Sequence, residues 1–152
     1  MIEQILLVAI LAIASGGAGW DIAKRQIPNM LCLALAILCA SYSYFSLGLE
    51  GLAWAALHAA IALLVGMALF AMGVLGGGDA KFYAAGALAL QLDQALAMFA
   101  ITAFSGFVLL LVMVFGRRFV LRSGYSASEL RQMQLPYGVA IALGLAITLL
   151  RF

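Results

Sequence analysis

Asp79 follows three consecutive glycines and lies between two strongly apolar stretches of the sequence. An ionised carboxylate at membrane depth costs about 3 kcal/mol or more, so an acid is found there mainly where it has a function. Glycines allow sharp bends and close approach of a second backbone, and irregular backbone within a bilayer persists only where protein or trapped water surrounds it. The segment Leu75–Lys81 therefore predicts a wet catalytic or transport cavity.

A second acid, Asp21, lies at the end of the first apolar stretch. Two carboxylates held close together share one proton, because the charge of the first opposes ionisation of the second, so one serves as base and the other as acid. Aspartic proteases use such a pair to activate water for attack on a peptide carbonyl, with no metal and no cofactor. The sequence has no HExxH or GxSxG pattern for a competing hydrolytic chemistry. Asp21 and Asp79 are thus candidates for an acid pair of this kind.

Each of these residues also has an ordinary structural interpretation. Asp79 directly precedes an apolar stretch and fits the N-cap position of a helix. Asp21 fits an ion pair at the membrane interface with Lys24 or Arg25. Lys81 is interpreted as an anchor whose charged end reaches the membrane–water interface. The residue types alone leave both interpretations open.

The remaining polar and reactive residues give weaker signals. His58, the only histidine, lies inside an apolar stretch and is interpreted as packed or hydrogen-bonded. Cys32 and Cys39 share one predicted helix, have no CxxC pattern, and are interpreted as small packing residues. The N-terminal apolar stretch lacks the basic start of a signal peptide, because its only early charge is Glu3, and is expected to be a retained first helix.

The composition indicates an integral membrane protein. The 152 residues are 67% hydrophobic and 9% charged, whereas a soluble domain is about 45–50% apolar and about 25% charged. The length fits an all-α membrane protein, a polytopic bundle of six transmembrane helices in a single domain of residues 1–152. The predicted helices are Ile2–Trp20, Asn29–Leu47, Leu52–Leu75, Ala80–Leu92, Ala95–Phe115 and Pro136 to the C-terminus. The fourth helix is short, since it reaches only about 20 Å and cannot cross the bilayer core unaided.

The distribution of basic residues predicts the orientation of the chain. All of them except Arg151 lie in or beside the connections that follow the first, third and fifth predicted helices. The positive-inside rule places these connections in the cytoplasm and both termini outside. Asp21 and Asp79 then face the same compartment, so the two acids can meet without a change of topology.

The polar stretch Gly116–Gln134 contains four arginines, from Arg117 to Arg131, and is interpreted as a contact with anionic lipid and an anchor of the topology. Within it, Ser126 and Glu129 have the spacing of a capping box and predict the start of a short interfacial helix. The sequence has no basic stripe of the kind that nucleic-acid-binding proteins carry. Membrane lipid is therefore an expected partner, and nucleic acid is not.

Three landmarks along the chain resemble one known family. They are Asp21 with Lys24, Ile27, Pro28 and Asn29, then Gly76-Gly77-Gly78-Asp79-Ala80-Lys81, and then Leu135-Pro136-Tyr137-Gly138 at the start of the last predicted helix. A GxGD pattern alone is weak, but the three together resemble the type IV prepilin peptidase family of GxGD aspartic proteases, in its order and at similar places in its helices. The resemblance covers essentially the whole chain.

The resemblance implies a role for each matched residue. Asp21 and Asp79 would be the catalytic pair, without a metal or cofactor, and Gly76 and Gly78 would shape the loop beside the substrate. Lys81 and Pro28 match supporting positions of the motifs. The implied substrate is a prepilin or pseudopilin, whose basic leader stays in the cytoplasm while its apolar helix enters the bacterial inner membrane. Cleavage would then fall at the cytoplasmic face.

One difference from the longer members of this family indicates which branch of the family the chain resembles. Those members carry a cytoplasmic insert with paired cysteines that is associated with methylation of the new N-terminus, whereas here the first predicted helix runs straight into Asp21. The chain resembles the short, peptidase-only branch that serves Flp-type tight-adherence pili, and N-methylation is not expected. Two other hypotheses stay open: a small proton-coupled transporter that uses buried carboxylates, and a non-catalytic subunit of a membrane assembly.

Overall fold

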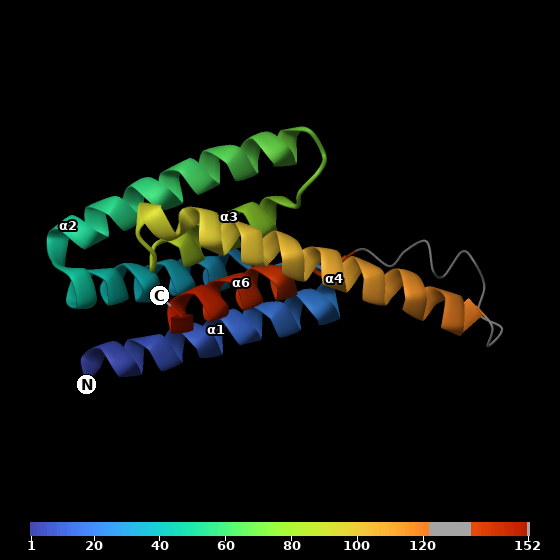
Figure 1. Ribbon diagram of the computed structural model, residues 1–152, viewed down its shortest axis with the longest axis horizontal. Helices are drawn as coiled ribbons and strands as arrows, with labels where there is room; N and C mark the ends of the chain where they lie inside the picture. Colours follow the sequence, from blue (N-terminus) through green and yellow to red (C-terminus); the bar gives the residue numbers. More distant parts are fainter. Residues whose placement is uncertain (122–134, 152) are drawn as a thin grey trace.

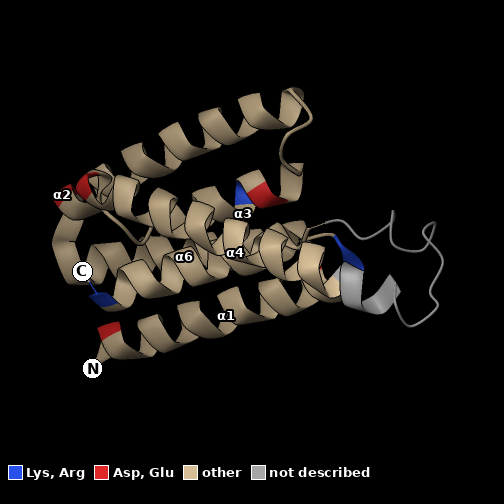
Figure 2. Ribbon diagram, turned by 45° about the vertical axis from the view of Figure 1, so that its right-hand side comes forward, with Lys and Arg blue, Asp and Glu red and all other residues tan. Residues whose placement is uncertain are grey.

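The computed structural model describes residues 1–121 and 135–151, and these residues form an all-helical protein. The elements are α1 (Ile2–Lys24), α2 (Asn29–Ala71), α3 (Gly77–Ala87), the 3-10 helix η1 (Leu92–Gln94), α4 (Ala95–Leu121) and α6 (Tyr137–Arg151). The long helices run side by side, with both termini at one end of the bundle (Figure 1). The charged positions lie mainly toward the helix ends, and the helix midsections are almost free of charge (Figure 2).

Three helical segments are long and apolar enough to cross a membrane. They are Ile2–Lys24, Asn29–Ala71 and Leu92–Gly116, and α6 is a shorter apolar helix. Their length and composition match the requirement of about 20 apolar residues for a spanning helix. The length and composition of the helices therefore confirm the predicted class, an all-α membrane protein.

The helix α2 contains the second and third predicted helices as one element. Gly48 interrupts it with φ 71° and ψ −167°, a conformation that is nearly restricted to glycine. The chain reverses there, so that α2 forms a hairpin of a first limb, residues 29–47, and a second limb, residues 49–71 (Figure 1). A single residue makes the turn, rather than the predicted connection of residues 48–51. The described residues thus form five α-helices, and the predicted count of six is not confirmed.

Two predicted helix boundaries are wrong at the acids. The helix α1 continues about one turn beyond Trp20 to Lys24, so Asp21 lies inside its last turn. The helix α3 begins at Gly77 instead of Ala80, because the chain bends earlier, at Gly73, where φ is 72°. Packing against α2 holds α3 in place, which outweighs the low helix propensity of its first glycines. The predicted short fourth helix is confirmed, since α3 has only 11 residues.

The other boundaries differ less. The third predicted helix ends at Ala71 instead of Leu75, and α3 ends at Ala87 instead of Leu92. The helix α4 begins at Ala95 as predicted but extends to Leu121, and the predicted capping box of Ser126 and Glu129 lies outside the described residues.

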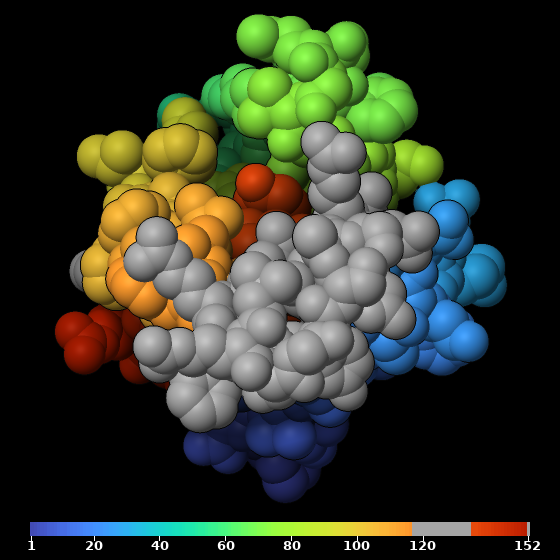
Figure 3. Space-filling model, turned by 90° about the vertical axis from the view of Figure 1, so that its right-hand side faces the viewer, coloured from blue at the N-terminus to red at the C-terminus, as the bar shows by residue number. Residues whose placement is uncertain are grey.

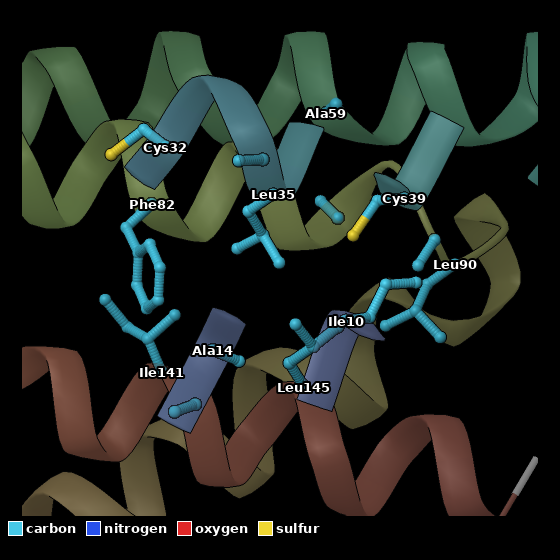
Figure 4. Packing of buried hydrophobic residues seen from close by; sticks show 14 of the residues in the cluster. Ile10, Ala14, Cys32, Leu35, Cys39, Ala59, Phe82, Leu90, Ile141 and Leu145 are labelled. Atoms are coloured by element: carbon cyan, nitrogen blue, oxygen red, sulfur yellow. The ribbon is translucent and has the colours of Figure 1, made fainter. Parts of the chain in front are cut away.

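The core forms where α1, the first limb of α2, α3 and α6 meet. Side chains from these four elements point toward one another (Figure 4). Ile10, Leu35, Phe82 and Leu145 are fully buried, and Cys32 and Cys39 are free thiols within the same cluster, as the packing interpretation predicted. This cluster fixes α1 against α3 and α6, and these are the elements that carry the two acids and the start of the last helix.

Two adjacent glycines of α1 are predicted to respond differently to alanine. A Cβ at Gly17 would lie 2.6 Å from Cζ of Phe82, a ring that is fully buried, whereas a Cβ at Gly16 would have nothing within 4 Å. We expect Gly17→Ala to destabilise the protein by about 1–3 kcal/mol through overpacking. Gly16→Ala should be neutral or slightly stabilising, because alanine favours the helix. Thermal unfolding of both variants in the same detergent checks this, and equal stabilities would contradict the packing of Phe82 on α1.

Candidate active site

Asp21 lies in the last turn of α1 and is only 6% exposed. Its Oδ2 accepts a hydrogen bond of 2.9 Å from the backbone N–H of Gly138, a residue 117 positions further along the chain. Gly138 belongs to the first turn of α6, where backbone N–H groups have no partner within the helix and the helix dipole favours a negative charge. The start of α6 therefore holds a buried carboxylate in one orientation.

The contact between Asp21 and Gly138 leaves little room for a side chain at position 138 of α6. A Cβ at Gly138 would lie 3.0 Å from both Cβ and Oδ2 of Asp21, and 3.1 Å from Cδ1 of Ile27. Glycine is favoured here by this close approach and not by backbone conformation, because Gly138 is helical. The third sequence landmark is thus joined to the first acid by direct contact.

Asp79 lies in the first turn of α3, with Gly76 at the N-cap. The interpretation of Asp79 as the N-cap is therefore wrong. Its carboxylate reaches back and accepts a hydrogen bond from the backbone N–H of Gly76, which is the return half of a capping box. A Cβ at Gly76 would lie 2.6 Å from Oδ2 of Asp79, so a glycine at this position lets the carboxylate fold over the backbone.

The second glycine of the motif, Gly78, packs against the segment that follows α1. A Cβ there would lie 3.5 Å from the carbonyl oxygen of Ile27, which is ordinary van der Waals contact. The carbonyl of Gly78 is 4.0 Å from Sγ of Cys32, which donates a weak hydrogen bond to it. Gly78 therefore places the start of α3 on the start of α2, and its own steric requirement is weaker than that of Gly76.

Lys81 and Pro28 support the same junction. Nζ of Lys81 donates a hydrogen bond of 3.1 Å to Oδ1 of Asn29, which is the first residue of α2. Pro28 is the N-cap of α2, with φ −62° and ψ 138°. Sequence reasoning included Asn29 among the landmarks but did not foresee this contact. It gives Lys81 a partner within the protein.

The two acids line one cavity of about 310 Å³. Its other lining residues come from the segment between α1 and α2 and from the glycine run, and they are Arg25, Gln26, Ile27, Asn29, Gly76, Gly77 and Gly78. A water occupies about 30 Å³ in the liquid, so this polar space has room for several waters or for a peptide backbone. Among the described residues, no group of three or more His, Cys, Asp or Glu side chains is placed to hold a metal ion.

Burial and, to a smaller extent, the negative charge of Asp21 together raise the pKa of Asp79 to about 6, although the hydrogen bond from Gly76 opposes both effects. Asp79 lies outside the three segments that are long enough to span a membrane. Below about pH 6 its carboxyl is neutral and above it is ionised. The surroundings of the two acids differ, because the Asp21 carboxylate accepts a hydrogen bond from the backbone of α6, whereas burial favours the protonated form of Asp79.

The raised pKa of Asp79 can be tested without a substrate. We expect infrared titration of the purified protein to show a protonated carboxyl band that disappears with a midpoint near pH 6 and is missing in Asp79→Asn. In Asp21→Asn the midpoint should fall, because the neighbouring charge is gone, but it should stay above the ordinary value for aspartate, because burial is the larger cause. A midpoint that is the same with and without Asp21 would show that the two acids are not coupled.

His58 lies apart from these acids. It is buried in the second limb of α2, and its Nδ1 is 3.2 Å from the carbonyl oxygen of Leu90. The interpretation of His58 as a packed, hydrogen-bonded residue is confirmed.

Together, the fold and this cavity define a helical membrane protein in which two carboxyl groups from distant parts of the chain share one polar site. The chain belongs to the type IV leader peptidase family, whose model matches residues 5–111. The match includes Asp21 and Asp79 and ends before Gly138, and it confirms the family that the landmarks resemble. No curated protein and no solved structure matches the chain. Membership of this family makes the protein a peptidase and hence a hydrolase.

Proposed function

We propose that this protein is an intramembrane aspartic endopeptidase that removes the leader peptide of type IV prepilins or pseudopilins of the Flp type. The observation that carries the proposal is the shared cavity, in which Asp21 and Asp79 are close enough for the charge of one to affect the pKa of the other. The family supplies the peptidase class. Gly76 shapes the bend before α3 and Gly78 the first turn of α3 at the site, and Lys81 and Pro28 stabilise the adjoining start of α2.

In the proposed reaction Asp21 is the base and Asp79 is the acid. Asp21 takes a proton from water as the water oxygen bonds to the carbonyl carbon, and Asp79 gives its proton to the carbonyl oxygen. The tetrahedral diol then collapses. The C–N bond breaks, the nitrogen receives the proton held by Asp21, and one diol hydroxyl returns its proton to Asp79. Both acids are restored, and no metal, cofactor or covalent intermediate takes part.

The proposed location is the bacterial inner membrane, with the site facing the cytoplasm and both termini outside. The positions of the basic residues support this orientation. The termini lie at one end of the bundle, and the end of α1 that carries Asp21 lies at the other (Figure 1). A prepilin whose leader stays in the cytoplasm would present its cleavage site at that end. The prepilin helix and membrane lipid are the proposed partners, and N-methylation and nucleic acid are not part of the proposal.

The test is co-expression of the protein with a candidate Flp-type prepilin, followed by intact-mass analysis of the pilin. We expect the mass to fall by that of a leader ending at a glycine only when this protein is present. An unchanged pilin mass, with the protein inserted in the same membrane, would refute the proposed activity.

A further inference from the structure

A second and larger cavity, of about 500 Å³, lies between the second limb of α2 and α4. Here α2 packs on α3 and α4 packs on α6, while α2 and α4 have little direct contact with each other. Viewed from the end opposite the termini, the end of α2 and α4 stand apart, with part of α6 visible between them (Figure 3). We call this cavity the α2–α4 groove.

The α2–α4 groove is lined mainly by apolar side chains, and several of them are largely exposed among the residues that the structure describes. Val65 of α2 is 54% exposed, and Phe99 and Phe107 of α4 are 59% and 56% exposed. Two of its few polar side chains are directed into the protein, because His58 contacts the carbonyl of Leu90 and the hydroxyl of Thr102 is buried. This lining fits an apolar occupant and offers little to a polar solute.

The groove lies next to the cavity that holds the two acids. Ala80 lines the groove and its neighbour Asp79 lines the cavity of the acids, while Tyr137 of the groove is the neighbour of Gly138. Along α4 the groove extends from Ala95 to Leu110, which corresponds to about 22 Å of helix. The hydrocarbon core of a bilayer is about 30 Å thick, so the groove accompanies most of a spanning segment.

We propose that the α2–α4 groove binds one face of the apolar helix of the substrate and thereby brings the peptide bond at the end of that helix to Asp21 and Asp79. This inference rests on the proposed function. A spanning segment within the bilayer must be helical, because its backbone groups have no water to bond. A helix seated between α2 and α4 would end beside Ala80 and Tyr137, next to the residues Asp79 and Gly138. The groove residues therefore select for an apolar segment at a fixed distance from the cut.

The test uses photo-crosslinking in the Asp79→Asn protein, which is expected to retain substrate uncut. A photo-reactive phenylalanine analogue replaces Phe99, which lines the groove, or Phe104, which is on the same helix, is 69% exposed and does not line it. We expect the analogue at position 99 to crosslink to the prepilin helix about tenfold more than the analogue at position 104. A tenfold preference for the groove corresponds to a free-energy difference of about 1.4 kcal/mol. Equal crosslinking at the two positions, or crosslinking of position 99 to lipid only, would overturn the assignment.

A steric pair of variants tests the same groove through activity. Val65→Trp fills the groove, whereas Leu64→Trp adds the same ring at a neighbouring position that is 73% exposed and outside it. We expect Val65→Trp to slow cleavage of the full prepilin about tenfold and to leave cleavage of a short peptide spanning the cut unchanged, with Leu64→Trp affecting neither. If the unmodified protein cleaves prepilin and both tryptophan variants behave alike, the groove assignment fails while the peptidase function stands. If the unmodified protein cleaves no prepilin, the proposed function itself fails, and the inference fails with it.

Discussion

Leader removal should be abolished in both Asp21→Asn and Asp79→Asn, with a loss of about 10³-fold or more. The two changes are nearly isosteric, so each leaves its cavity and helix in place. Asparagine at position 21 still accepts the hydrogen bond from Gly138 but cannot take a proton from water. Asparagine at position 79 still reaches Gly76 but has no acidic proton to give. Intact-mass analysis of the co-expressed prepilin over time measures the loss.

A third acid provides the control for these variants. Asp93 lies in η1 and is exposed, and it does not line the cavity of the two acids. Asp93→Asn removes the same charge from the chain and should process prepilin at the unmodified rate. All three variants must reach the membrane in equal amounts. Processing that persists in either Asp21→Asn or Asp79→Asn would exclude a mechanism that uses both acids.

The sequence predicted that the two acids face the same compartment, and the structure places both at one cavity. Hydropathy marked the apolar stretches, and the basic residues marked the connections that share a compartment, so Asp21 and Asp79 were expected to face one way. The low helix propensity of glycine also predicted a break before Asp79. The break is real, but it lies at Gly73 to Gly76, and Gly77 and Gly78 join the helix because packing on α2 decides their conformation.

The sequence patterns did not predict which segments far apart in the chain are in contact. The hydrogen bond between Asp21 and Gly138 joins the last turn of α1 to the first turn of α6, and no local rule specifies which helices pack together. The hydrogen bond from Lys81 to Asn29 also joins residues that lie far apart in the chain, so no local rule predicts it. The α2–α4 groove arises because Gly48 turns α2 back within a single residue and the second limb then packs on α3 and not on α4. Each of these features depends on tertiary packing, which periodicity and propensity do not encode.

Gly138→Ala is predicted to reduce cleavage by up to about 10-fold, because the Asp21 carboxylate must shift by a few tenths of an ångström and a misplacement of about 1 Å at a reacting group can cost about 100-fold. The added methyl would lie 3.0 Å from Oδ2 of Asp21, so the carboxylate must move away from the backbone N–H that orients it. Gly138 is thus a positioning residue that acts through Asp21. The loss should fall on kcat and leave KM nearly unchanged, because Gly138 does not line the α2–α4 groove.

Two further variants separate this effect from a general loss of packing. Gly16→Ala adds the same methyl to α1 where nothing lies within 4 Å, and it should cleave prepilin at the unmodified rate. The double variant Gly138→Ala with Ile27→Val removes Cδ1 of Ile27, which would lie 3.1 Å from the new methyl, but leaves the contact with Asp21. We expect the double variant to remain impaired, because the carboxylate is still displaced. Recovery of full activity in the double variant would assign the defect to crowding of Ile27, and the start of α6 would then have no part in orienting the base.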